Sequence, residues 1–140
     1  MQIKIKKLYE DAKLPSYSHP GDVGMDMYAM ADTELKPGER KILFTGFVLE
    51  FPEGYAAIVK DKSGLPKNFG LHTMGGVFDA GYRGEYNVNM MNLGQETYKI
   101  SKGDKIAQIV FLPVIIAELK EVDELNSSSR GEGRFGSTGK

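Results

Sequence analysis

The sequence predicts an all-β domain of the sandwich, barrel or jelly-roll kind. Many short runs of branched and aromatic residues recur along the chain, and turns rich in glycine and proline separate them. Helix signals are scarce, since the best candidate, "KSGLPKNFG", contains Pro66 and flanking glycines that limit it to one or two turns. At 140 residues the chain has the size of one domain that buries a substantial core.

The expected strands lie at residues 2–8, 41–51, 54–60, 84–92 and 105–119. The first alternates isoleucine with lysine, the pattern of a half-buried strand, and Gly46 interrupts the second. The fourth places Tyr86, Val88 and Met90 on one face. The fifth is the most apolar run, and Pro113 divides it, which favours two strands joined at a bend or an edge.

Composition argues against several classes of function. A net charge of -1 supplies no broad basic field, so neither nucleic acid nor a membrane is an expected partner. The absence of cysteine excludes a disulfide framework and a thiolate metal site, which suits a reducing compartment. The chain lacks both a long apolar run and the apolar segment of a signal peptide, so we expect a cytoplasmic protein, in the host cytoplasm if it is viral.

The composition changes once, at "ELNSSSRGEG". We therefore expect a β-barrel core at residues 1–125 and a flexible, glycine-rich C-terminal arm at residues 126–140. Arg130 offers a planar fork for phosphate oxygens, and Phe135 offers a face for stacking on a base. The segment can be both a disordered tail and a lid that closes over a nucleotide, because a lid is mobile when no ligand is bound.

Two further stretches favour phosphate and metal binding. In "PGDVGMDMYA" the carboxylates of Asp22 and Asp26 suit Mg2+, although a surface turn with solvated acids explains them too. In "DKSGLPKNFG" the run Lys62, Ser63, Gly64 can present a charge, a hydroxyl and a backbone N–H to one phosphate. A helix N-cap explains the serine equally well.

The stretch "MGGVFDAGYRGEYNV" is the candidate for catalysis. Its glycines allow close backbone approach, and "DAGYRG" between strand-like runs is typical of a hairpin. Asp79 follows two apolar residues and could act as a general base on a water. The alternative is a turn in which Tyr82 packs on its own hairpin. His19 and His72 have no metal-ligand spacing.

Taken in order, five motifs resemble the trimeric dUTPase family: "DVGMDMYA", "KSGL", "GGVFDAGYRGEYNV", "KGDKIAQIVF" and "RGEGRFGSTG". The resemblance implies a β jelly roll, or β-clip barrel, with at most one short helix. It implies a homotrimer that cleaves dUTP to dUMP and pyrophosphate with Mg2+, in sites that three subunits share. Such an enzyme keeps uracil out of DNA and supplies dUMP for dTMP synthesis.

The resemblance also assigns roles. Asp79 would activate the water that attacks the α-phosphorus, Tyr82 would exclude a ribose 2'-OH, and Asp26 would reach Mg2+ through a bound water. Arg130 would clamp the γ-phosphate while Phe135 stacks on the uracil. The residues that it assigns to substrate binding are Lys62, Ser63, Gly64, Thr73, Gly76, Val77, Phe78, Asp79, Tyr82, Asn87, Gln108, Arg130, Phe135, Gly136 and Ser137.

Three residues depart from the family pattern. Lys62 stands where the family commonly has arginine, Gly81 stands where an acidic residue is frequent, and Arg134 stands where glycine is usual. Two alternatives remain open. One is a dCTP deaminase or bifunctional dCTP deaminase/dUTPase, which needs a glutamate near the pyrimidine; Glu85, beyond the hairpin's tip, is a weak candidate. The other is a regulatory, dUTPase-like binding protein.

Overall fold

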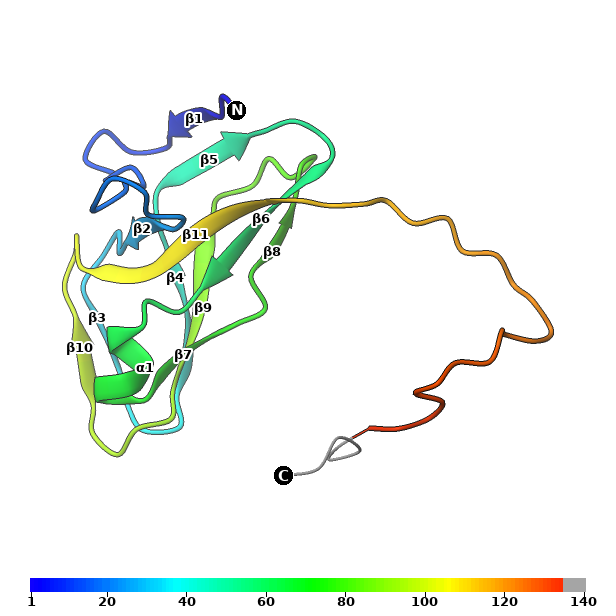
Figure 1. The fold of residues 1–140 in the computed structure, drawn as a ribbon. Helices are drawn as coiled ribbons and strands as arrows, with labels where there is room; N and C mark the ends of the chain where they lie inside the picture. The colour runs from blue at the N-terminus through cyan, green and yellow to red at the C-terminus, as the bar shows by residue number, and fades with distance from the viewer. Residues whose placement is uncertain (135–140) are drawn as a thin grey trace.

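The computed structural model describes residues 1–134 and confirms the all-β prediction (Figure 1). A single short helix, α1 (Gly64–Phe69), lies where the sequence predicts one. The strands are β1 (Lys4–Lys7), β2 (Met25–Tyr28), β3 (Thr33–Leu35), β4 (Arg40–Phe44), β5 (Phe47–Glu50), β6 (Tyr55–Lys60), β7 (Leu71–Met74), β8 (Val77–Asp79), β9 (Asn87–Asn92), β10 (Tyr98–Ile100) and β11 (Lys105–Pro113).

The strands form a four-stranded sheet, β2-β11-β6-β8, a three-stranded sheet, β4-β9-β7, and two pairs, β1-β5 and β10-β3, with antiparallel pairing throughout. One core cluster draws on both larger sheets, with Val59 and Ile109 from the first and Val88 and Met90 from the second. Burying the inner faces against one another is what holds this layered arrangement together.

The period-two pattern of residues 84–92 is confirmed in β9. Tyr86, Val88 and Met90 are each about 1% exposed or less, whereas the intervening side chains are half-buried. By contrast, β1 is exposed along its whole length in the single chain, so the predicted half-burial holds for Ile3, which packs against the core just before the strand, but not for Ile5.

The predicted hairpin around "DAGYRG" is wrong. β8 pairs with β6, whereas β9 pairs with β4 and β7, so the two strands belong to different sheets. Gly75 and Gly76 explain the difference, because their φ angles of 68° and 91° turn the chain out of the β7 sheet just before β8. The segment between Asp79 and Asn87 is therefore a connection between sheets.

The prediction of two strands in residues 105–119 is also wrong for the described chain. β11 runs unbroken to Pro113, which pairs with Tyr55 as the last residue of the strand. Proline suits this position because it has no N–H to donate to a continuing ladder. Beyond the bond from the Val114 N–H to the Gly54 carbonyl, the chain leaves the body of the molecule (Figure 1).

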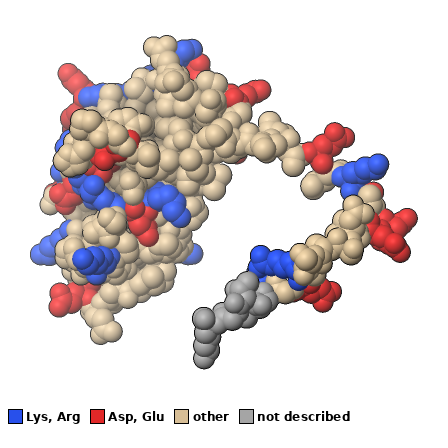
Figure 2. Space-filling model, in the orientation of Figure 1, with Lys and Arg blue, Asp and Glu red and all other residues tan. Residues whose placement is uncertain are grey.

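The segment of residues 115–134 runs clear of the sheets in this single chain, and charges of both signs are spread along it (Figure 2). It departs from the body before residue 126, where the arm is predicted to begin, and that boundary stays a prediction. In the described part of the chain no helix has the length and apolarity needed to cross a membrane.

We predict that Gly76→Ala destabilises the fold strongly. A Cβ at Gly76 would lie 2.7 Å from the Val59 carbonyl oxygen, in a residue already at positive φ. Because strain and clash combine, the expected loss in free energy of unfolding is about 3 kcal/mol or more. The measurement is urea unfolding of the variant against the wild-type chain.

Gly54→Ala is the matched control, since φ is 82° there and nothing lies within 4 Å of an added Cβ. Strain alone should cost it about 1–2 kcal/mol. Equal losses in the two variants would contradict the close approach of Gly76 to Val59.

Candidate active site

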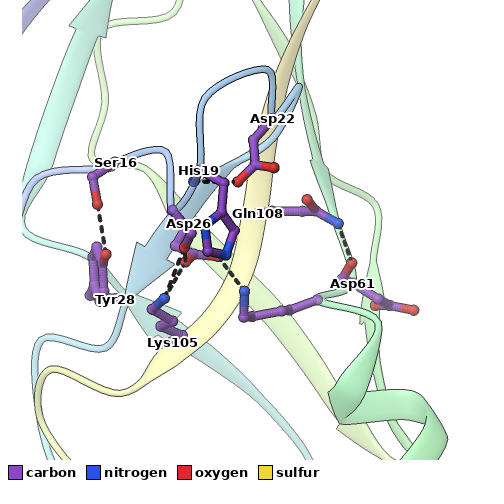
Figure 3. Close-up of polar contacts among 10 residues, drawn as sticks. Ser16, His19, Asp22, Asp26, Tyr28, Asp61, Lys105 and Gln108 are labelled. Carbon is purple, nitrogen blue, oxygen red and sulfur yellow. Dashed lines mark hydrogen bonds and ion pairs between the residues drawn. The ribbon is translucent and has the colours of Figure 1, made fainter.

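An open cleft of about 410 Å3 lies beside the ends of β2, β6 and β11 (Figure 3). It is the polar cavity that brings together three of the predicted residues, Asp26, Lys62 and Gln108. Its lining residues are Ser18, His19, Asp22, Val23, Gly24, Asp26, Lys62, Lys105 and Gln108.

The sheet register builds this cleft. Gln108 on β11 pairs with Asp26 on β2 and with Lys60 on β6. Directly paired residues place their side chains on the same face, so three distant parts of the sequence meet there. Gly24 lies close to Gln108 at the rim, since an added Cβ would clash with the Gln108 side-chain oxygen and would force that side chain to move.

The Asp26 carboxylate is buried, with its side chain 5% exposed, and lies between two lysines. Lys62 Nζ lies 2.6 Å from its Oδ1 and Lys105 Nζ lies 2.6 Å from its Oδ2, while the Ser18 hydroxyl donates to Oδ2 at 2.7 Å. Burial raises the pKa of Asp26, but the hydrogen bonds from Lys105, Lys62 and Ser18 outweigh it and lower the pKa to about 2. Asp26 is therefore a carboxylate at neutral pH.

Ser63 and Gly64 begin helix α1 next to this ion pair. Ser63 occupies the N-cap position, but its side chain makes no capping hydrogen bond, so the capping interpretation is not supported. Ser63 is exposed to solvent. The hydroxyl is thus available to a ligand beside Lys62.

Asp79 ends β8 and is exposed. Its carbonyl accepts a hydrogen bond from the Tyr82 N–H at 3.0 Å. The Tyr82 ring packs on Phe78 and Tyr86, with ring centroids 5.5 and 5.7 Å apart, and remains 38% exposed. Tyr82 can therefore pack within the turn and still contact a ligand, because part of its ring remains exposed near Asp79.

The ring of Tyr86 stacks on the rings of both Phe47 and Phe78. Within the described residues its buried hydroxyl has no hydrogen-bond partner. Burial raises the pKa of this hydroxyl to about 12, so it stays protonated. The packed rings of Phe78, Tyr82 and Tyr86 therefore adjoin the turn that follows Asp79.

A single chain does not bring all the predicted residues together. Asp79 pairs with Ala56 and Gln108 pairs with Lys60, so Asp79 and the cleft lie four residues apart along β6, or about 13 Å. Arg130 donates to the Gly133 carbonyl at 3.1 Å, within the segment of residues 115–134 that runs clear of the sheets (Figure 1). Phe135, Gly136 and Ser137 lie outside the described residues.

The sequence prediction missed three residues of the site: Lys105, Ser18 and Asp61. The Gln108 amide nitrogen donates to the Asp61 carbonyl at 2.9 Å, which joins the cleft to the segment before α1. Lys105 lies three residues before Gln108 in the motif "KGDKIAQIVF", and this short spacing could have identified it as a site residue. Nothing in the local sequence indicates that Ser18 contacts Asp26.

The donor set decides how a metal could bind. The described residues contain no cluster of three or more His, Cys, Asp or Glu suited to a metal ion. Both oxygens of Asp26 already accept hydrogen bonds from protein groups. This arrangement fits an ion held mainly by substrate phosphates, with Asp26 reached through water, because Mg2+ usually keeps several waters.

We predict that Asp26→Asn lowers the free energy of unfolding by about 2 kcal/mol at neutral pH. The wild-type pKa of about 2 lies below the ordinary 3.8, so the carboxylate's contribution is complete above about pH 4 and is lost as the pH falls through about 2. Urea unfolding at several pH values between 7 and 2 measures the difference.

Asp22→Asn removes an exposed carboxylate from the same cleft and is the control. An equal deficit in both variants, or a deficit for Asp26→Asn that persists unchanged at the lowest pH, would contradict the stabilising role of the ion pairs.

Comparison with known proteins gives one consistent result. The deoxyuridine 5'-triphosphate nucleotidohydrolase of Clostridium tetani (strain Massachusetts / E88) is 43% identical over 140 residues, covering 99% of this chain and 97% of that protein. The protein of the same name from Thermobifida fusca (strain YX) is 45% identical over 142 residues, covering 99% of this chain and 79% of that protein.

Solved structures agree. The dUTPase of Staphylococcus bacteriophage 80alpha with dUpNHpp has a TM-score of 0.93 at 30% identity, covering 99% of this chain and 98% of that chain. A mutant dUTPase from phage phi11 of S. aureus, described for its coordination of a structural Mg(II) ion, has a TM-score of 0.84 at 29% identity, covering 91% and 100%. The dUTPase family model matches residues 10–139. The chain therefore belongs to the dUTPase family.

Proposed function

We propose that this chain hydrolyses dUTP to dUMP and pyrophosphate. The cleft carries the proposal, because a buried carboxylate holds Lys62 and Lys105 side by side next to the exposed Ser63 hydroxyl. Two fixed cations and a hydroxyl suit a polyphosphate. The similarity to proteins named for dUTP hydrolysis supports the choice of nucleotide.

Asp79 is the proposed general base. Its carboxylate orients a water and accepts its proton while the water oxygen bonds to the α-phosphorus. The bond between the α-phosphorus and the oxygen that bridges to the β-phosphorus breaks, and pyrophosphate leaves. Lys62, Ser63 and Gly64 hold the α- and β-phosphates, with Gln108 beside them.

The edge of the four-stranded sheet supports uracil recognition. β8 is the last strand, so one side of its backbone has no ladder partner within the described residues. Backbone groups from Gly76 to Asp79 can thus pair with the uracil edge, while Tyr82 offers its exposed ring to the deoxyribose. A base with mismatched donors would leave these groups unpaired, which penalises the wrong nucleotide.

Mg2+ is the proposed cofactor, and Asp26 the residue that reaches it through water. When bound, the ion would spread the charge of the phosphates and improve pyrophosphate as a leaving group. Lys62 is already ion-paired with Asp26, so its charge is shared between this carboxylate and the substrate. Because lysine offers one point charge where the family's common arginine offers a bidentate fork, we expect weaker phosphate binding at this position.

A homotrimer with shared sites is the proposed assembly. The segment that leaves β11 carries Ile115, Ile116, Leu119 and Leu125 almost fully exposed, and such side chains require a partner surface. The distance between Asp79 and the cleft along β6 also leaves each chain with an incomplete site. A neighbour that supplies the base, and another that supplies the arm with Arg130 and Phe135, completes it.

The deaminase alternative loses its candidate acid. The Glu85 carboxylate accepts a hydrogen bond from the Gly46 N–H at 2.8 Å, so it joins two segments of the fold rather than facing a pyrimidine. The proposed role in the cell follows from the reaction: the protein removes dUTP before uracil enters DNA and supplies dUMP for dTMP synthesis.

The first prediction of this proposal is selective pyrophosphate release from dUTP. With Mg2+, a coupled pyrophosphate assay should respond to dUTP and give little signal with dCTP, UTP or dTTP. Asp79→Asn should lower kcat by about a thousandfold or more, since it removes the base without changing the size of the side chain.

Product analysis separates the alternatives. Uracil product from dCTP would assign the protein to the deaminase class. Tight dUTP binding with no turnover of any nucleotide would favour a regulatory binding protein.

The second prediction concerns the arm. A chain ending at Ser129 should fold and assemble as the full chain does, because no described residue from 115 onward contributes to the core cluster. Its turnover of dUTP should nevertheless fall about a hundredfold or more, because Arg130 and the rest of the lid are lost. Circular dichroism and light scattering check the fold, and the pyrophosphate assay checks turnover; full activity in this chain would remove the lid model.

A further inference from the structure

Asp61 lies between β6 and α1, directly before the run Lys62, Ser63, Gly64, and makes an unusual set of contacts. Its Oδ1 accepts the Thr73 backbone N–H at 2.6 Å, and its Oδ2 lies 2.7 Å from His72 Nδ1. Its own carbonyl accepts the Gln108 amide N–H at 2.9 Å. One residue thus bonds to both β7 and β11.

These contacts close a loop at its base. The chain from Asp61 through α1 to Thr73 carries the proposed phosphate-binding run, and the two ends of the loop meet at the Asp61 carboxylate. Within the loop, α1 has no fully buried residue, although Leu65 packs partly against the core and the Phe69 ring lies 4.8 Å from the Tyr98 ring, and the loop ends in β7. These contacts hold the later part of the loop, whereas its first part, next to the exposed Ser63, is fixed by polar contacts of Asp61 and Lys62.

The second anchor of the loop is the ion pair between Lys62 and Asp26. Asp61 fixes the backbone on one side of Lys62, while Asp26 fixes its side-chain end. Together they hold Ser63 and Gly64 at the mouth of the cleft. Losing Asp61 would leave the lysine attached at its tip but free to move at its backbone.

The Asp61 carboxylate is suited to this task. Its side chain is 23% exposed, against 52% for His72, so it is the more enclosed member of the pair. Burial raises its pKa, but the hydrogen bonds from His72 and Thr73 outweigh this and hold the pKa below 3.8. The carboxylate is ionised at neutral pH, and its bonds to these donors are charge-assisted.

We propose that Asp61, held by His72 and Thr73, is a positioning residue that sets the phosphate-binding run Lys62–Gly64 against the cleft. This proposal rests on the proposed function for the identity of the ligand. The fixing of the loop itself does not, so the two can be tested separately. No contact between Asp61 and the substrate is required.

The test uses the full chain in four variants. Asp61→Ala removes the anchor, and His72→Leu removes one donor. His72→Asn should rescue, because the asparagine amide can donate from nearly the position of Nδ1. Asp32→Ala is the matched control, since Asp32 Oδ1 also accepts a backbone N–H, from Lys102 at 2.7 Å, away from the cleft.

Amide hydrogen exchange, measured without ligand, reports on the loop directly. Asp61→Ala should speed exchange about tenfold or more within residues 62–73, and His72→Leu should do so to a smaller extent. His72→Asn should return to the wild-type pattern, and Asp32→Ala should leave the loop unchanged. Unchanged exchange in Asp61→Ala, or exchange raised equally across all strands, would overturn the proposal.

Binding then tests the consequence for the site. Asp61→Ala should weaken dUpNHpp about tenfold and leave deoxyuridine, which has no phosphate, within about twofold of wild type. An equal loss for both ligands would overturn the positioning role in favour of a general structural one. Failure of the wild-type chain to bind dUpNHpp would instead refute the proposed function, while the exchange result would still decide the fixing of the loop.

Discussion

The ion pairs between the buried Asp26 carboxylate and two lysines are the interaction on which the candidate site depends. A buried carboxylate is costly unless it is paired and hydrogen-bonded, and Lys62, Lys105 and Ser18 provide that compensation. The same contacts bring three strand ends together, because the partners lie on or beside β2, β6 and β11. Removing one partner would leave uncompensated charge at the mouth of the cleft, so the geometry of the site and the stability of this region are coupled.

The sequence predicts local features well because they obey local rules. The alternation of Tyr86, Val88 and Met90 identifies β9, and the glycines and Pro66 limit the helix. The pairing of strands is a different matter. Two strands separated by a short turn-like segment are normally expected to pair, yet β8 and β9 enter different sheets, since the Gly75–Gly76 turn has already moved the chain between them.

The candidate site shows the same division. The motifs locate Asp26, Lys62, Gln108 and Asp79 because residue type and order are visible in one chain. The partners of Asp26 and the three-way contacts of Asp61 arise only when strands far apart in the sequence align in register, which no local pattern reports. The exposed apolar side chains beyond Pro113 are a further case, because no local pattern shows that this apolar run leaves the sheets in the single chain.

The central claim is that the catalytic base and the arm serve one site from different chains. The most direct test unfolds Asp79→Asn and the chain ending at Ser129 together, refolds the mixture and measures pyrophosphate release from dUTP. Each protein alone should be nearly inactive, whereas random mixing into trimers should restore roughly a quarter of wild-type activity, because each mixed trimer then contains one intact site. Activity no greater than the sum of the separate variants, in a mixture shown to contain mixed trimers, would contradict the shared-site account.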